Sequence, residues 1–69
     1  MKNEDKQLIC HLLLPALQRT RNLYDLVDLK YHADTETVTA VFQSGYKKHA
    51  NVALDSGTSM IRDIIKQIV

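Results

Sequence analysis

The sequence has little of several residue types on which specialised folds depend. Its 69 residues include one cysteine, one proline, two glycines and no tryptophan. A single cysteine cannot form an intramolecular disulfide, which excludes the stapled scaffolds of small secreted proteins and favours a reducing, cytoplasmic setting. Both glycines fall where turns are expected, so no glycine-rich phosphate loop is present. Stability must therefore come from apolar packing or from a partner.

Long apolar runs and a charge excess are also missing. No apolar run approaches the roughly 20 residues that span a bilayer, so we expect no membrane segment. The first six residues lack the basic start and small-residue cleavage site of a signal peptide, so we expect no secretion. Nine Lys and Arg against eight Asp and Glu give a net charge of +1, far from the balance of a dedicated nucleic-acid binder. We expect residues 1–69 to form one soluble domain.

The spacing of apolar residues changes twice along the chain. A helical stripe comes first: Leu8, Leu12, Leu13, Ala16 and Leu17. Alternating residues follow in two segments: Val27, Leu29 and Tyr31, then Val38, Ala40 and Phe42. A second helical stripe ends the chain: Met60, Ile61, Ile64, Ile65 and Ile68. This order predicts an α+β fold, αβββα, in which a helix, a three-stranded antiparallel meander and a second helix follow one another, with both helices on one face of the sheet.

The first helix is expected to run from Asn3 or Asp5 to Arg21 or Asn22, with polar side chains at its start capping the free amides. Pro15 falls inside this segment, where proline removes one backbone hydrogen bond and costs about 3 kcal/mol. We therefore expect either a kink near residues 11–14 or two short helices, with Pro15 in the first turn of the second.

Turn-forming residues separate the three expected strands. The first strand covers residues 26–32, with Val27, Leu29 and Tyr31 on one face. A turn at residues 33–36 leads into the second strand, residues 37–43. Ser44-Gly45 predicts a hairpin, because glycine supplies the positive φ of a tight turn. Residues 46–54 fit a helix or a strand; the hairpin before them and the helix-breaking residues after them favour the strand.

The last helix is expected to begin at Asp55 or Ser56, with a side-chain oxygen capping its first turn, and to run to the end of the sequence. Its isoleucine stripe is the strongest apolar signal in the chain. Burial of four isoleucines is worth roughly 6 to 12 kcal/mol gross, so the sheet is not expected to fold without this helix.

Residues that can bind metals or act as nucleophiles do not form sets. Cys10 and His11 are adjacent on a helix and point about 100° apart, so they do not easily share a metal, and a buried thiol is the ordinary expectation. His32 and His49 are expected on strands that flank the middle one, roughly 10 Å apart, which is too far for a common ion.

Residues 57–59 would suit an anion at a helix amino terminus, although the same residues are ordinary capping chemistry. The sequence shows no convergent acids, no serine with a histidine base and no zinc-protease pair. It therefore predicts no enzyme, no cofactor and no metal centre.

A group of basic residues suggests a binding surface. Lys47 and His49 share one face of a strand, and Thr39 and Lys30 can continue that face on neighbouring strands. The candidate surface consists of Lys30, His32, Thr39, Lys47, Lys48 and His49. It would meet phosphates or an acidic protein surface. The alternative is that lysines on an edge strand block unwanted strand pairing.

The order of elements is similar to that of the double-stranded RNA-binding domain, and residues 45–50, Gly-Tyr-Lys-Lys-His-Ala, resemble the lysine motif of that family. In that family the lysines open the second helix, whereas here they precede the expected helix by at least seven residues. The resemblance thus implies a topology and assigns no RNA contacts. Residues 51–64 also resemble short uncharacterised reading frames of bacterial prophages and mobile elements, which implies a bacterial cytoplasmic accessory protein.

These features predict a small non-enzymatic interaction module that acts through a free sheet face, an edge strand or self-association. A core this small gains from an identical partner, and the apolar Ile68 and Val69 favour a homodimer that buries part of the last helix or pairs edge strands. The alternative function is weak binding of nucleic acid through Lys30, Lys47, Lys48 and nearby arginines.

Overall fold

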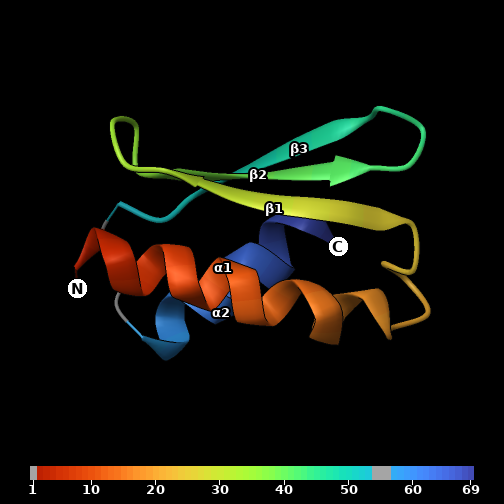
Figure 1. Cartoon of the computed structure of the whole chain (residues 1–69), viewed down its shortest axis with the longest axis horizontal. Coiled ribbons are helices and arrows are strands. Elements are labelled where there is room, and N and C mark those ends of the chain that lie inside the picture. The colour runs from red at the N-terminus through yellow and green to blue at the C-terminus, as the bar shows by residue number, and fades with distance from the viewer. Residues whose placement is uncertain (1, 54–56) are drawn as a thin grey trace.

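The structure, a computed structural model, describes residues 2–53 and 57–69. Its elements are α1 (Asn3–Gln18), β1 (Leu26–His32), β2 (Thr37–Phe42), β3 (Lys47–Asn51) and α2 (Thr58–Ile68). The strands form an antiparallel sheet in the order β1-β2-β3. Both helices lie on one side of this sheet (Figure 1), where α1 packs on β1 and α2 packs on β3. The predicted αβββα fold is confirmed.

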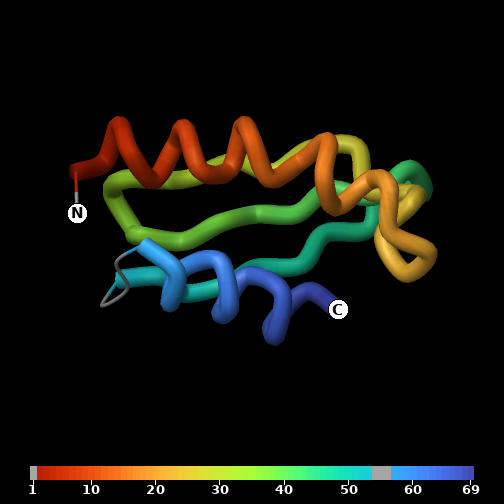
Figure 2. The backbone as a smooth tube through the Cα atoms, turned by 90° about the horizontal axis from the view of Figure 1, so that it is seen from below, coloured from red at the N-terminus to blue at the C-terminus, as the bar shows by residue number. Residues whose placement is uncertain are grey.

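The two helices cover the two edge strands of the sheet. Seen from below in Figure 2, α1 and α2 run in the same direction, and the chain of β2 is visible between them. The core fills the space between the two layers. Its buried apolar residues are Cys10, Leu17, Leu23, Leu26, Leu29, Tyr31, Val38, Ala40, Phe42, Ala50, Val52, Met60, Ile64 and Ile68. None of the described helices covers the opposite face of the sheet, which is therefore open.

A β-bulge in β1 changes which residues of that strand enter the core. The register with β2 shifts between Leu26 and Asp28. Leu26 is buried as a result, and Val27, which the alternating pattern placed in the core, is 50% exposed. A bulge adds one residue to a strand without a partner opposite, so alternation restarts after it. The prediction for Val27 was wrong, and those for Leu29 and Tyr31 are confirmed.

Two tight turns join the strands where the sequence predicted them. Gly45 has φ 91°, and its N–H donates to the carbonyl of Phe42 at 2.8 Å. The first turn, at residues 33–36, ends with Glu36 in the left-handed region, at φ 52°. β3 is a strand, as predicted, although it covers only Lys47–Asn51. Leu54, which was predicted to extend it, lies outside the described residues.

α1 is a single helix that ends three residues earlier than the earliest predicted position. Lys2 occupies the N-cap position without a side-chain hydrogen bond, so the predicted polar cap is not formed. Pro15 lies inside the helix, and the alternative of two short helices is wrong. Because proline has no backbone N–H, the carbonyl of His11 loses its usual partner in the helix. Both residues are exposed, so water can satisfy that carbonyl.

The buried faces of both helices are rotated from those predicted. α1 buries Lys6, Cys10 and Leu17, whereas Leu8 and Leu12 are 52% and 62% exposed. α2 begins at Thr58, after Gly57 at φ 58°; the predicted capping residues Asp55 and Ser56 lie outside the described residues. In α2 the buried positions are Met60, Ile64 and Ile68, while Ile61 is half-buried and Ile65 is 39% exposed. Thus half of the isoleucine stripe does not enter the core.

Candidate interaction surfaces

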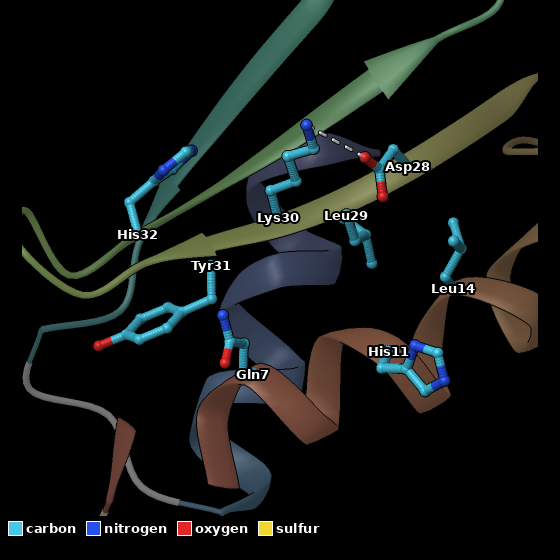
Figure 3. Close-up of a pocket in the computed structure, with 8 residues that line it drawn as sticks. All are labelled: Gln7, His11, Leu14, Asp28, Leu29, Lys30, Tyr31 and His32. Atoms are coloured by element: carbon cyan, nitrogen blue, oxygen red, sulfur yellow. Dashed lines mark ion pairs between the residues drawn. The ribbon is translucent and has the colours of Figure 1, made fainter. Parts of the chain in front are cut away.

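The open face of the sheet carries polar side chains from all three strands. The strand register places Lys30, Thr39 and His49 in one row across the sheet. The row beside it contains Asp28, Val41 and Lys47. Figure 3 shows Lys30 and His32 on the open side of β1, and Leu29 and Tyr31 on the side that faces α1.

His32 and His49 converge on the hydroxyl of Thr39. Nε2 of His32 and Nδ1 of His49 each lie 3.0 Å from Thr39 Oγ1. The two ring nitrogens are therefore at most about 6 Å apart, closer than the 10 Å spacing expected of their strands. Thr39 is 8% exposed, whereas both histidines are exposed. The two imidazoles thus share one buried hydroxyl beneath them.

Lys48 does not belong to this face. In β3 it lies between Lys47 and His49 and therefore points to the helix side of the sheet. Its Nζ donates to the carbonyl of Ile68 at 3.2 Å, which ties β3 to the end of α2. The sequence was enough to place Lys48 on the face opposite Lys47, because neighbouring residues of a strand point to opposite faces. Of the six predicted surface residues, the structure brings five to the open face and places Lys48 on the other.

The charges on the open face are partly paired. Lys30 Nζ lies 3.7 Å from Asp28 Oδ2, and both side chains are well exposed, so this ion pair adds little stability. Lys47 is exposed and forms no ion pair with the residues that the structure describes. The net charge of this face is therefore positive, because it carries Lys30 and Lys47 and one acidic residue, Asp28.

A hollow of about 420 Å³ lies at the β1 edge of the molecule. It is bounded by residues 28–32 of β1 and by Gln7, His11 and Leu14 of α1 (Figure 3). His11 lies on the exposed side of α1, and Cys10 is 1% exposed on the inner side. The two residues therefore face different environments, as their adjacency on a helix predicted.

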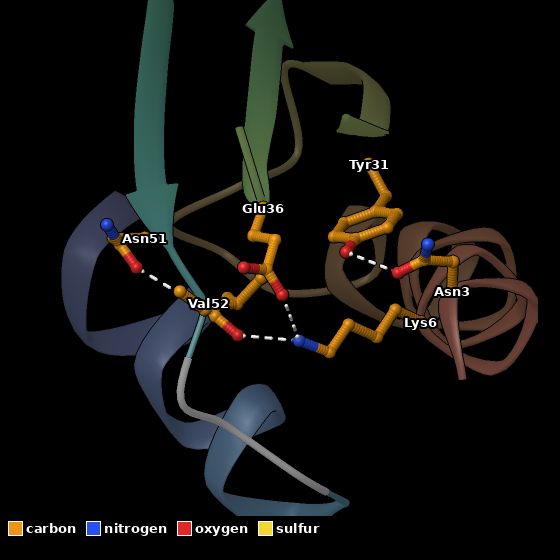
Figure 4. A network of polar contacts seen from close by, with 7 residues as sticks. Asn3, Lys6, Tyr31, Glu36, Asn51 and Val52 are labelled. Carbon is orange, nitrogen blue, oxygen red and sulfur yellow. Dashed lines mark hydrogen bonds and ion pairs between the residues drawn. The ribbon is translucent and has the colours of Figure 1, made fainter. Parts of the chain in front are cut away.

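A buried lysine joins the beginning of α1 to the chain after β3. Lys6 Nζ donates to the carbonyl of Val52 at 2.7 Å and lies 3.9 Å from Glu36 Oε1 (Figure 4). The same nitrogen lies 5.8 Å from the centre of the Tyr31 ring, whose hydroxyl donates to Asn3 Oδ1 at 3.0 Å. The Lys6 side chain is 3% exposed and that of Glu36 is 46% exposed. Sequence patterns gave no signal for this lysine, because its partner carbonyl is 46 residues away.

Burial makes the acidic groups near this lysine harder to ionise. It raises the pKa of the Cys10 thiol to about 11. Burial also raises the pKa of Tyr31, and the nearby charges of Glu36 and Cys10 add to that effect. A thiol with so high a pKa is a poor nucleophile at neutral pH. Cys10 therefore serves as an apolar core residue.

The outer side of the helix layer has an apolar surface. A groove lined by Ile9, Leu12, Leu13, Ala16 and Ile61 lies between α1 and α2. Leu8, Leu12 and Ile65 are large apolar residues exposed on these helices. One helical stripe of exposed residues runs along the outer side of α1 and ends just after the helix: Asp5, Leu8, Leu12, Ala16 and Arg19. Their spacing of three or four residues was visible in the sequence, but nothing there showed which side of α1 met the sheet.

Among residues 2–53 and 57–69, no three His, Cys, Asp or Glu side chains gather as they would around a metal ion. In the same part of the chain, no helix combines the length and the apolarity needed to cross a membrane. The chain matches no protein-family model, no curated protein and no solved structure. A proposal about its function must therefore be based on its surfaces.

Proposed function

We propose that the protein is a small non-enzymatic interaction module that pairs with a second copy of itself through the outer side of its helix layer. The observation that carries this proposal is the exposure of Leu8 and Leu12, at 52% and 62%, beside the apolar groove between the helices. Contiguous apolar surface of this kind marks sites of protein association.

The charges on α1 support a second copy as the partner. Acidic residues Glu4 and Asp5 lie in the first turn of the helix, and Arg19 follows its last residue. In the exposed stripe, Asp5 and Arg19 are each seven residues from Leu12, on opposite sides of it. A two-fold axis through Leu12 therefore packs two α1 helices antiparallel, with Asp5 of each copy opposite Arg19 of the other.

The same axis makes the apolar contacts self-complementary. Leu8 and Ala16 are each four residues from Leu12, so the larger side chain of one copy lies opposite the smaller one of the other. Leu12 contacts its own equivalent at the centre. A standard interface buries about 800 Å² per partner, roughly a sixth of the 4667 Å² surface of the chain. The helix layer is the apolar surface from which such an area would come.

The test is the oligomeric state of charge-swapped variants, measured by sedimentation equilibrium. The wild type is expected to be a dimer, and Leu12→Glu, which places two carboxylates on the axis, a folded monomer. Asp5→Arg and Arg19→Asp should each weaken the dimer by about 1 kcal/mol or less, because rim pairs are exposed, and the double variant should restore it. Val27→Thr makes an apolar side chain of the sheet polar, at a position that is 50% exposed, and serves as the control. A monomeric wild type, or a double variant weaker than both single ones, would refute the proposal.

A second candidate function is weak binding of nucleic acid through the open sheet face. The observation that favours it is the common face of Lys30, Lys47 and the two histidines. Two lysines on phosphates predict that log affinity falls with log salt with a slope of about −1.8. Lys30→Glu with Lys47→Glu should abolish binding to a short duplex, and Lys66→Glu, on α2, should not. A duplex that does not bind at low salt would exclude this function.

A further inference from the structure

We propose that Thr39, His32 and His49 form an oxyanion-binding site that opens when the two histidines gain protons. Its ligand is a tetrahedral oxyanion of the sulfate or phosphate class. The proposal does not depend on the dimer, and it deepens the second candidate function, since backbone phosphates belong to this class of ligand.

The hydrogen bonds around Thr39 depend on the charge of the histidines. Each ring presents one nitrogen to Thr39 Oγ1 at 3.0 Å. A hydroxyl has one hydrogen to donate and two lone pairs to accept with. With neutral rings, one ring N–H donates to Oγ1 and the Oγ1 hydrogen donates to the other ring. The donors that point between the three residues of this trio, Thr39, His32 and His49, are then used in hydrogen bonds within the trio.

Protonation changes this arrangement. Both nitrogens of a charged imidazole carry a hydrogen, so both rings donate to Oγ1. The two lone pairs of Oγ1 are then filled, and the hydroxyl hydrogen must find an acceptor elsewhere. Each ring also keeps a second N–H for a ligand. Acidification therefore adds two positive charges and releases the Thr39 hydroxyl as a donor at one place on the sheet.

The surroundings favour an anion over a cation. The open face holds two lysines and one carboxylate, and that carboxylate already pairs with Lys30. β2 contributes threonine and valine to this face, without an ionisable group. The helices pack against the other face, and the Glu36 carboxylate lies toward Lys6. The ionisable groups that face the trio from its own and neighbouring strands are Asp28, Lys30 and Lys47.

Thr39 also holds the two rings in position. It lies on the central strand, directly opposite His49 in the register and diagonal to His32. Because it is 8% exposed, its position is fixed by the sheet. Charge-assisted N–H donors held by such a group bind oxyanions more strongly than neutral ones. The site is therefore built on rigid strands.

Sulfate is the suitable probe, because it stays a dianion across the pH range in which histidines change charge, about pH 5 to 8. Its binding is followed by the amide NMR shifts of residues 32, 39 and 49, at the two ends of that range. We expect affinity at least about tenfold higher at the acidic end, from two added charges at contact distance. Equal affinity at both ends, or shifts confined to the lysines, would overturn the proposal.

Four variants locate the site. His32→Asn and His49→Asn should each remove most of the pH dependence. Thr39→Val, which keeps the shape of the side chain, should remove tight binding at acidic pH. Thr37→Val is the matched control, because Thr37 lies on the same strand and face but bonds to Thr35 Oγ1 at 2.8 Å; it should bind as the wild type does. Tight acidic binding by Thr39→Val would refute the role of the hydroxyl.

A duplex titration at the same two pH values separates this site from the second candidate function. Sulfate binding without duplex binding at acidic pH leaves the oxyanion site standing and excludes nucleic acid as its ligand. Duplex binding that neither Thr39→Val nor acid affects shows that the lysines act alone, and it contradicts the site.

Discussion

Replacement of Lys6 by methionine tests what the buried lysine contributes. Methionine keeps most of the apolar stem and removes the ammonium. The Val52 carbonyl then loses its donor at 2.7 Å, in a residue that is 0% exposed. An orphaned buried acceptor costs about 1 to 3 kcal/mol. The variant also loses the other contacts of the ammonium, but it no longer buries a charge, and that gain offsets part of the loss. We therefore expect Lys6→Met to reduce the free energy of unfolding by about 1 to 3 kcal/mol.

The contribution of the ion pair is expected to be small. Glu36 lies 3.9 Å from the ammonium, and its side chain is 46% exposed, so water can replace the lysine. Glu36→Gln should therefore cost less than about 1 kcal/mol. In a double-mutant cycle with Lys6→Met, the coupling energy should stay below the same limit. The hydrogen bond to Val52 would then be the main interaction of the ammonium.

Urea unfolding followed by circular dichroism measures these differences. A chain of this length is expected to have about 3 to 10 kcal/mol of stability, so a loss of 2 kcal/mol moves the midpoint clearly. High salt should change the effect of Lys6→Met little, because the hydrogen bond is buried. A Lys6→Met variant as stable as the wild type would refute the argument, since the cost of burying the ammonium would then equal everything it gains.

Three further predictions concern the turn, the thiol and the last helix. Glu36→Gly should leave stability unchanged or raise it by up to about 1 kcal/mol, because glycine accepts φ 52° without strain; clear destabilisation in urea would contradict this. Burial raises the pKa of Cys10 from 9.0 to about 11. Native Cys10 should therefore react with a thiol reagent at pH 8 about a hundredfold more slowly than a thiol with a pKa of 9.0. Rapid labelling of the folded protein would show that Cys10 is not buried. Ile64→Val should cost about 0.5 to 1.5 kcal/mol and Ile65→Val less than about 0.5 kcal/mol, from their exposures of 0% and 39%; equal losses in urea unfolding would contradict the orientation of α2.

The period of the apolar residues was enough to predict the elements and their order. It was not enough to predict which residues enter the core. Val27 left the core because a bulge breaks alternation, and a bulge depends on how two strands pair. On α1, Leu8 and Leu12 lie on the outer side and Cys10 and Leu17 on the inner side, so both sides carried apolar residues and packing on the sheet decided which side is buried.

The sequence was enough to predict only part of the open face. Alternation along the strands was sufficient to place Lys47 with His49 on one side, and it also excludes Lys48 from that side. The approach of His32 to Thr39 was not predictable, because it depends on the register between β1 and β2. A shift of one residue would have placed Thr39 on the helix side of the sheet. Contacts between distant positions, as in the Lys6 to Val52 bond, need the full fold.

The arrangement of the two surfaces makes a prediction about their independence. The apolar groove lies on the helix layer and the histidines lie on the opposite face of the sheet. A two-fold axis through Leu12 therefore stacks the layers as sheet, helices, helices and sheet, with the two oxyanion sites on opposite outer faces. One anion cannot then reach both sites, so pairing should not change the affinity of either. Leu12→Glu should bind sulfate at acidic pH within about twofold of the wild type. A large loss of affinity in this monomer would show that the partner contributes to the site, and would refute the antiparallel pairing on the helix layer.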